Sequence, residues 1–396
     1  MKNKLINPYR PGAGTKPLVL AGRDQELEDV SQIFDALLLN IPTQSIIYSG
    51  LRGVGKTVLL NALEEIAEEK GIFSKHIEVE TRNDFISQIS ACAQSYIRKY
   101  STRDKVQHLV DTALDAVKSL NVSFDPSNNT FALSVKEREL YMSTNLTQSL
   151  TDVFTAIGEL AYRTGRPVCF FIDEIQYMKQ EELGALIAAV HRSNQLGYPV
   201  MIIGAGLPKI YSMLSKEKSY SERLFIYKEI GGLDADAAKK AIVGPAEKVG
   251  MAYAEDAVQK IIEITKGYPF FIQQFCRIIY AQVENTNIGV QDVTACLEKY
   301  YEELDDGFFK VRYERCSEND KRFIFAMVRC GELPCTIGGI AKNLHRRTTE
   351  ISPTRAQLIN KGIIYPVHYG ELDFTVPEFD GFINRLDEYQ KWESEE

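Results

Sequence analysis

Residues 48–60 read YSGLRGVGKTVLL and place three glycines, a lysine and a threonine within eight positions. Residues 50–57 of this stretch match the pattern G-x-x-x-x-G-K-[ST] in full. The apolar, β-branched run QSIIYS before it, at 44–49, predicts a buried strand. VLLNALEEIAEEKG after it predicts an amphipathic helix that ends at Gly71. Strand, glycine-rich loop and helix in this order are typical of a phosphate-binding loop.

The residue types of this loop suit the phosphates of ATP. Glycines let backbone N–H groups turn inward around phosphate oxygens, and the start of the helix adds positive potential. We expect Lys56 to reach the β and γ phosphates and Thr57 to bind Mg²⁺. The predicted nucleotide-binding residues of the loop are Gly50, Arg52, Gly53, Val54, Gly55, Lys56, Thr57 and Val58.

A second stretch, PVCFFIDEIQ at 167–176, supplies carboxylates. Its apolar residues predict a buried strand that ends in Asp173 and Glu174. In a parallel sheet, the carboxyl end of a strand faces the ligand. We therefore expect Asp173 to hold the Mg²⁺ and Glu174 to polarise the attacking water. The alternative is an acidic turn that merely follows a core strand.

Composition restricts the broad class of the protein. The chain has 396 residues, of which 44% are hydrophobic, so two or three globular domains are expected. The net charge of −8 argues against a surface coated for nucleic acid, although a local basic patch remains compatible with it. Apolar runs such as 168–172 are too short for a membrane span, and the first residues contain no apolar signal core. Seven scattered cysteines predict free thiols and a cytoplasmic protein.

Two further stretches resemble a known family. LVLAGRDQELEDV at 18–30 resembles the Gly-Arg-x-x-Glu-Leu opening of AAA+ and STAND-type ATPases, which covers the adenine and implies nucleotide contacts for Gly22 and Arg23. TKGYPFFIQQF at 265–275 resembles the Gly-x-Pro start of their lid helix, which implies the same for Pro269. With the two motifs above, the resemblance covers roughly residues 8–290. The family is that of bacterial AAA+ ATPases related to the origin-recognition and initiator ATPases.

The sequence departs from this family at two positions. Initiator ATPases usually place an arginine three residues after the lid glycine, where it touches the γ phosphate, and here that residue is Phe270. The sensor strand, PVMIIGAGLP at 199–208, ends in Gly-Ala-Gly and offers no Asn or Thr side chain. Both departures favour a slow switch over a fast motor.

KSYSERLF at 218–225 contains Arg223 just before a short apolar run. In AAA+ proteins an arginine at this point often reaches the γ phosphate of a neighbouring subunit. The resemblance implies that catalytic role for Arg223 and, with it, a homo-oligomer or another AAA+-type neighbour. The alternative is a surface arginine paired with Glu222 or Glu229.

Between and after these motifs the pattern is mostly helical. FSKHIEV at 73–79 predicts a strand, 83–119 is helix-periodic, and 122–135 alternates around a turn-rich centre, as in a β-hairpin. Helices are also predicted at 138–164, 179–196, 234–249, 255–266, 269–285 and 290–304. The last four correspond to the small helical lid of AAA+ proteins.

From about Glu318 the expected order is helix, helix, turn, helix and hairpin, which is typical of a winged helix. The predicted fold class is α/β: a P-loop NTPase with an AAA+-like parallel sheet and flanking helices, a helical lid and a C-terminal winged-helix domain. The expected boundaries are 1–225 for the ATPase core, with a hairpin insertion near 120–137, 226–309 for the lid and 310–396 for the winged helix.

Charge gives the C-terminal domain a candidate DNA-binding role. Residues 310–385 hold 12 Lys and Arg residues against 9 Asp and Glu residues, a local net charge of +3. Arginines before a recognition helix suit phosphates, and one on the helix suits a base edge. The candidate DNA contacts are Arg346, Arg347, Thr348, Thr349, Arg355 and Lys361. The alternative is a protein-contact module, since winged helices also serve that purpose.

The sequence thus predicts an ATP-binding, slowly hydrolysing switch that couples nucleotide state to binding of double-stranded DNA. One rival is a STAND-type signalling ATPase whose winged helix binds protein. Another is a nucleotide-binding module without hydrolysis, which the missing sensor side chains favour. The expected cofactors are ATP and Mg²⁺.

Overall fold

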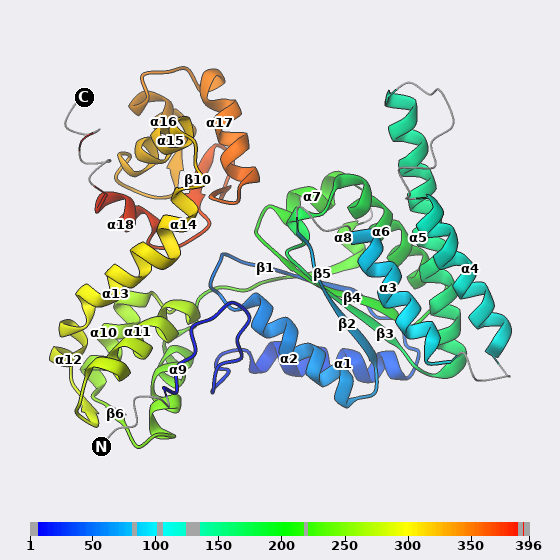
Figure 1. The fold of residues 1–396 in the computed structure, drawn as a ribbon, viewed down its shortest axis with the longest axis horizontal. Coiled ribbons are helices and arrows are strands. Elements are labelled where there is room, and N and C mark those ends of the chain that lie inside the picture. Colours follow the sequence, from blue (N-terminus) through cyan, green and yellow to red (C-terminus); the bar gives the residue numbers. More distant parts are fainter. Residues whose placement is uncertain are drawn as a thin grey trace. The chain divides into compact units, whose positions relative to one another are not determined.

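The computed structural model describes residues 7–80, 85–100, 106–123, 135–217, 221–386 and 391 (Figure 1). The chain divides into two compact units. One consists of Arg23–Gly50 with Lys56–Ile230, and the other of Met1–Gly22, Leu51–Gly55 and Gly231–Glu396. Each unit has its own hydrophobic core.

The first unit is built on a five-stranded parallel sheet. The strands are β1 (Ser45–Ser49), β2 (Phe73–Glu78), β3 (Val168–Asp173), β4 (Val200–Gly206) and β5 (Phe225–Glu229). Their order is β2-β3-β4-β1-β5, so β4 separates β1 from β3. The inner strands β1, β3 and β4 are buried along their whole length, as expected of strands covered on both faces.

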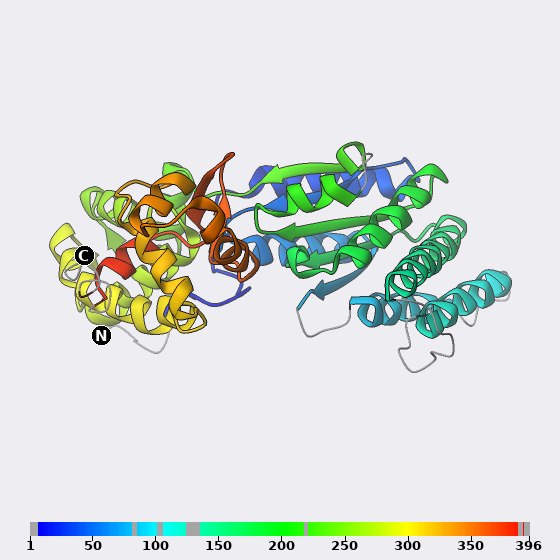
Figure 2. The same cartoon turned by 90° about the horizontal axis from the view of Figure 1, so that it is seen from above.

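Helices cover both faces of this sheet. The helices of this unit are α1 (Asp24–Leu38), α2 (Lys56–Glu69), α3 (Phe85–Arg98), α4 (Gln107–Ser123), α5 (Val135–Thr164), α6 (Gln180–Gln195), α7 (Ile210–Glu217) and α8 (Ser221–Leu224), of which α4 packs on α3 and α5. Figure 1 shows α1 and α2 on one side of the sheet and α6 and α7 on the other. The long helices α4 and α5 run side by side, and α5 also packs on α6 (Figure 2).

The lid part of the second unit is mainly helical. It contains α9 (Ala235–Glu247), α10 (Glu255–Thr265), α11 (Pro269–Gln282), α12 (Val290–Ala295) and α13 (Leu297–Leu304). A short parallel pair, β6 (Ala252–Tyr253) with β7 (Asn287–Ile288), adds strands to a region that the sequence predicted to be entirely helical. The first described residues also pack against the lid. The Asn7 amide donates to the Arg277 carbonyl oxygen, and the Tyr9 hydroxyl donates to the Ile242 carbonyl oxygen.

The C-terminal part follows a π-helical turn, Asp305–Phe309, which continues α13. Its elements are α14 (Lys310–Tyr313), α15 (Glu318–Val328), β8 (Cys335–Thr336), α16 (Ile337–Asn343), α17 (Thr348–Asn360), β9 (Ile364–Pro366), β10 (Glu371–Phe374) and α18 (Phe379–Asn384). The three strands form one antiparallel sheet in the order β8-β10-β9. The three helices and the final hairpin occur in the predicted order, and β8 is an addition that the sequence analysis missed.

Two predictions for the first unit need comment. The helix-periodic stretch 83–119 contains two helices, α3 and α4, rather than one. Most of the predicted hairpin at 122–135 lies outside the described residues, which leave out 124–134. The ends of the predicted hairpin are helical, because residues 122 and 123 belong to α4 and residue 135 to α5. None of the helices within the described ranges is both long and apolar enough to cross a bilayer.

Candidate nucleotide site

The start of α2 brings the lysine and threonine of the glycine-rich motif next to the end of β1. Lys56 is the first residue of α2, and its side chain is buried. The Lys56 ammonium donates to the Gly50 carbonyl oxygen at 2.9 Å. Gly50 itself is tied to the neighbouring strand, since its N–H donates to the Gly206 carbonyl oxygen at 3.1 Å. The ammonium therefore bonds the carbonyl that directly follows β1, and a phosphate oxygen can replace that carbonyl as its acceptor.

Thr57 and Asp173 lie together although their strands are not neighbours. The Thr57 hydroxyl donates to Asp173 Oδ2 at 2.5 Å, and Asp173 Oδ1 accepts the Glu174 N–H at 2.8 Å. Asp173 is 2% exposed, and its carboxylate is bonded at both oxygens. The sequence analysis assigned both Thr57 and Asp173 to Mg²⁺, from two motifs more than a hundred positions apart.

The paired oxygens of Thr57 and Asp173 fit a magnesium ion. Mg²⁺ prefers oxygen ligands and is usually held in phosphate sites by one or two protein groups together with phosphates and water. A hydroxyl and a carboxylate oxygen within 2.5 Å of each other provide two adjacent ligands of that kind. Among the described residues, no group of three or more His, Cys, Asp or Glu side chains is arranged to hold a metal.

Glu174 follows β3 in an unusual backbone conformation. Its φ of 54° lies in the left-handed region, which residues other than glycine seldom adopt. The Glu174 carboxylate is half-buried and accepts a hydrogen bond from the Gln176 amide, two residues further on. Strained backbone of this kind is often found at functional sites, where surrounding contacts hold it in place.

The middle of the loop, residues 51–55, packs with the second unit. Gly53 and Gly55 have φ values of 84° and 91°, which require glycine. The Arg52 N–H donates to the Thr375 carbonyl oxygen at 3.0 Å, and the Gly53 carbonyl oxygen accepts the Phe270 N–H at 3.2 Å. A Cβ on Gly53 would lie 3.3 Å from Phe270 Cβ. Within the second unit, residues 51–55 therefore contact both the lid and the C-terminal part, which the sequence did not indicate.

The remaining predicted nucleotide contacts are scattered. Gly22 has a φ of 65°, and a Cβ there would lie 2.6 Å from Ala237 Cβ, so this position needs glycine for packing. Arg23 is buried at the start of α1, and Val58 is half-buried in α2. Pro269 is the first residue of α11, a favoured position because its missing N–H is not needed there.

Arg223 lies in the short helix α8 and is exposed. Its carbonyl oxygen accepts a hydrogen bond from the Gln44 amide at 2.7 Å. Within the described residues the Arg223 guanidinium forms no ion pair with Glu222 or Glu229, the partners of the surface-arginine alternative. Its role across subunits stays a prediction.

The candidate DNA contacts fall into two groups. Arg346, Arg347, Thr348 and Thr349 are all exposed around the start of α17. Arg347 also pairs with Glu350 one turn later at 3.1 Å. Arg355 is half-buried, and within the described residues its Nε is buried without a hydrogen bond. The sequence analysis missed Tyr369, which lies fully exposed in the turn between β9 and β10.

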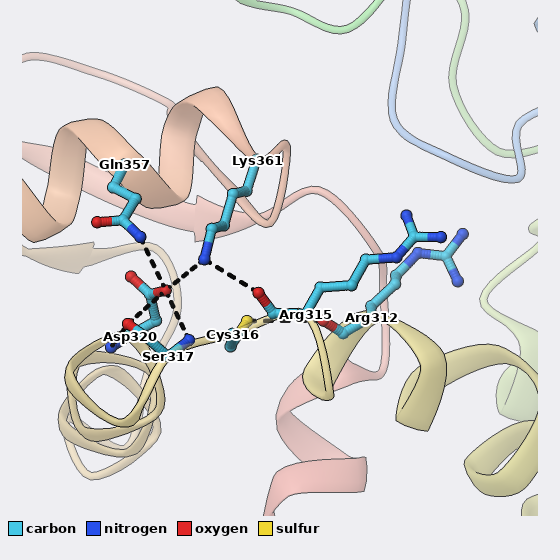
Figure 3. Close-up of polar contacts among 7 residues, drawn as sticks. All are labelled: Arg312, Arg315, Cys316, Ser317, Asp320, Gln357 and Lys361. Atoms are coloured by element: carbon cyan, nitrogen blue, oxygen red, sulfur yellow. Dashed lines mark hydrogen bonds and ion pairs between the residues drawn. The ribbon is translucent and has the colours of Figure 1, made fainter. Parts of the chain in front are cut away.

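Lys361 belongs to an internal network instead (Figure 3). Its ammonium donates to Asp320 Oδ2 at 2.6 Å and to the Arg315 carbonyl oxygen at 3.0 Å. Asp320 is fully buried and also accepts hydrogen bonds from Ser317 and Gln357. Burial raises the pKa of Asp320, but these donors outweigh it and hold the pKa below its ordinary value. Lys361 therefore ties α17 to α15 and does not present a free ammonium to DNA.

Comparison with known proteins bears on the class of protein. Residues 19–203 match the family described as AAA ATPase domain, and residues 306–383 match a domain of unknown function, DUF8462. The Walker-type ATPase paby2304 of Pyrococcus abyssi has 16% identity and a TM-score of 0.54, covering 94% of this chain and 98% of that chain. Aeropyrum pernix Orc1 in complex with DNA has 16% identity and a TM-score of 0.45, covering 95% of each chain. No curated protein matches this sequence.

The family match and the strand order define the class of protein. A five-stranded parallel sheet carries the glycine-rich motif after β1 and the Asp-Glu pair after β3, within the residues that match the ATPase family. Residues 19–203 thus form a P-loop ATPase domain of the AAA+ type, and ATP hydrolysis is the activity of this class. The predicted AAA+ resemblance and core fold are confirmed.

The Lys361 network yields a stability prediction. Lys361→Met removes the cation from a buried carboxylate, and we expect a loss of about 2–3 kcal/mol of folding free energy at neutral pH. Because the pKa of Asp320 is lowered, this contribution is full above the ordinary carboxyl pKa and is lost as the pH falls through the lowered value. Thermal unfolding of the full chain at neutral and acidic pH measures it.

Arg347→Met is the matched control for this experiment. It removes a cation from the exposed pair with Glu350, and exposed pairs contribute little to stability. We expect no measurable change in unfolding temperature for Arg347→Met. Equal effects of the two variants at neutral pH would contradict the structural role of Lys361.

Proposed function

We propose that the chain is an ATP-dependent switch in which nucleotide at the 50–57 loop sets the state of the C-terminal domain, residues 310–396, and that this domain binds duplex DNA. The observation that carries the proposal is the pair of backbone bonds from the loop, Arg52 to Thr375 and Gly53 to Phe270. When the loop changes shape around bound phosphates, the backbone hydrogen bonds of Arg52 and Gly53 change with it. The domain boundaries and a cytoplasmic location remain predictions.

In this proposal the ATP chemistry is carried by the loop and β3. The Lys56 ammonium leaves the Gly50 carbonyl and binds the β and γ phosphates. Thr57 and Asp173 would hold a magnesium ion, which would supply neutralisation of charge on the phosphates. Glu174 orients the attacking water, and Arg223 approaches the nucleotide of a neighbouring subunit. Phe270 in place of an arginine and the absence of a polar side chain at the end of β4 support a low rate.

Coupling to the C-terminal domain is supported by a continuous row of aromatic rings. Phe270 stacks on Phe308 with ring centroids 4.7 Å apart, and Phe308 contacts Phe309 at 5.4 Å. Phe309 in turn stacks on Phe382 of α18 at 5.4 Å. We call these four residues the aromatic row. Phe308 and Phe309 lie in the π-helical turn, a rare conformation that is frequent at functional sites.

DNA binding by the C-terminal domain is supported by its element order and its surface. The order helix, strand, helix, helix, strand, strand is that of a winged helix, with α17 in the place of a recognition helix. Arg346 and Arg347 are exposed at its start, and Tyr369 projects from the hairpin turn. These side chains suit phosphates and an exposed sugar or base edge.

A STAND-type protein-contact role is the second candidate. Glu350 lies beside Arg347 at the start of α17, and backbone and side-chain hydrogen bonds from Arg347 lower the pKa of Glu350, which keeps it ionised. A carboxylate there opposes DNA phosphates and suits a basic protein surface. The binding experiments below separate the two candidates.

The first prediction of this proposal concerns ATP affinity. Lys56→Ala removes the ammonium aimed at the phosphates, and we expect ATP to bind about 10- to 100-fold more weakly. Lys70→Ala, which removes a half-buried lysine just after the same helix that pairs with Asp35, is the control and should bind ATP like the parent. Calorimetry with Mg²⁺ present measures both. Parent-like affinity of Lys56→Ala would rule out the phosphate-loop assignment.

The second prediction concerns DNA. Phosphate contacts make affinity fall with salt by about 0.9 log units per log unit of salt for each phosphate. Exchanging Arg346 and Arg347 for Ala should flatten that slope by about 2 for a mixed-sequence duplex. Lys299→Ala in the lid is the control and should keep the parent slope. Absence of duplex binding at low salt, with and without ATP, would leave the protein-contact candidate.

The third prediction isolates the aromatic row. Phe270→Ala keeps the backbone N–H and the Cβ that contact Gly53 and removes only the ring that stacks on Phe308. We expect ATP to bind with parent affinity but no longer to change the affinity for duplex DNA. Tyr162→Ala, a half-exposed ring on α5, should preserve the coupling. If ATP changes the DNA affinity of Phe270→Ala as much as it does in the parent, the aromatic row does not carry the coupling.

A further inference from the structure

Gln176 is a buried polar residue that no part of the proposed ATP chemistry uses. It lies in the 3-10 turn η2 (Ile175–Tyr177) that follows β3, and it is 3% exposed. Its amide nitrogen donates to the Glu174 carboxylate, and its amide oxygen accepts the Leu207 N–H at 3.0 Å. One side chain therefore joins Glu174 to the backbone directly after β4.

The orientation of this amide follows from its partners. The Leu207 N–H can only donate, so the atom facing it must be the amide oxygen. The NH₂ end is thereby turned toward the Glu174 carboxylate, which can only accept when ionised. Glutamine suits both partners at once, whereas a glutamate in its place has no donor for Glu174 when ionised.

The glycines at the end of β4 make room for this arrangement. A Cβ on Gly206 would lie 2.6 Å from Gln176 Oε1, closer than any real contact. A Cβ on Gly204 would lie 2.2 Å from Ile175 Cδ1 in the same turn. The β4 end lacks a polar side chain of its own because the space beside it is filled by the η2 turn and the amide of Gln176.

We propose that Gln176 is the positioning residue for Glu174: its amide fixes the carboxylate and ties it to the segment after β4. This inference rests on the proposed role of Glu174 in hydrolysis. The left-handed backbone of Glu174 places the carboxylate where Gln176 can reach it, and a charge-assisted hydrogen bond then restricts its rotation. A carboxylate held in one orientation needs no reordering when it meets the attacking water.

Two substitutions of Gln176 separate its contacts. Gln176→Met keeps the length of the side chain and loses both hydrogen bonds. Gln176→Glu keeps an acceptor for Leu207 and places a second carboxylate against Glu174. We expect Gln176→Met to lower kcat for ATP about 10-fold and to leave ATP affinity within about twofold of the parent.

For Gln176→Glu we expect a change in the pH profile. Two adjacent carboxylates resist ionising together and share a proton. The acidic limb of kcat should therefore move to higher pH by about one pH unit, an effect that a purely structural role for Gln176 does not produce. Gly206→Ala, which pushes on the amide oxygen without altering Gln176, should also lower kcat. Circular dichroism and thermal unfolding establish that each variant is folded.

Glu174→Gln provides the reference for these measurements. If Glu174→Gln abolishes turnover while Gln176→Met hydrolyses ATP at the parent rate with the parent pH profile, the positioning role is wrong and the role of Glu174 stands. If the Glu174→Gln variant hydrolyses ATP at the parent rate, the role of Glu174 and the positioning role of Gln176 are both wrong. Loss of kcat when Gln176→Met is made in the parent, with no further loss when it is added to Glu174→Gln, supports the inference.

Discussion

Residues 51–55, the centre of the phosphate loop, are held within the second unit by two backbone hydrogen bonds. Arg52 donates to Thr375, close to the end of the C-terminal hairpin, and Gly53 accepts from Phe270 at the start of the lid helix. A loop with two glycines at positive φ has the freedom to change shape, and these bonds restrict that freedom. In the proposed switch, nucleotide binding changes the shape of the loop and thereby changes these two hydrogen bonds.

Strand order determines the chemistry of the site. With β4 between β1 and β3, Thr57 and Asp173 meet at the carboxyl ends of two strands that are not hydrogen-bonded to each other. The same order brings the end of β4 beside the turn that carries Gln176. Small residues at the end of β4 are therefore a packing requirement of the site as well as a departure from the initiator pattern.

The sequence predicted the parts of the site that consist of local patterns. The loop, the buried strand before it, and the Asp-Glu pair each form one continuous stretch, so periodicity and motif spacing were sufficient. Gln176 and Thr375 went unnoticed because their roles depend on partners far along the chain. The same reason explains the error at Lys361, which looks like an ordinary surface lysine until α15 brings the buried Asp320 within 2.6 Å.

The most direct test of the account is amide hydrogen exchange in the C-terminal hairpin, residues 363–376, with and without saturating ATP and Mg²⁺. The account predicts that nucleotide changes the exchange rates of this segment, since the loop and Thr375 share a hydrogen bond. It also predicts no such change in Lys56→Ala at the same ATP concentration. Identical exchange in the parent protein with and without bound nucleotide would contradict the coupling of the phosphate loop to the C-terminal domain.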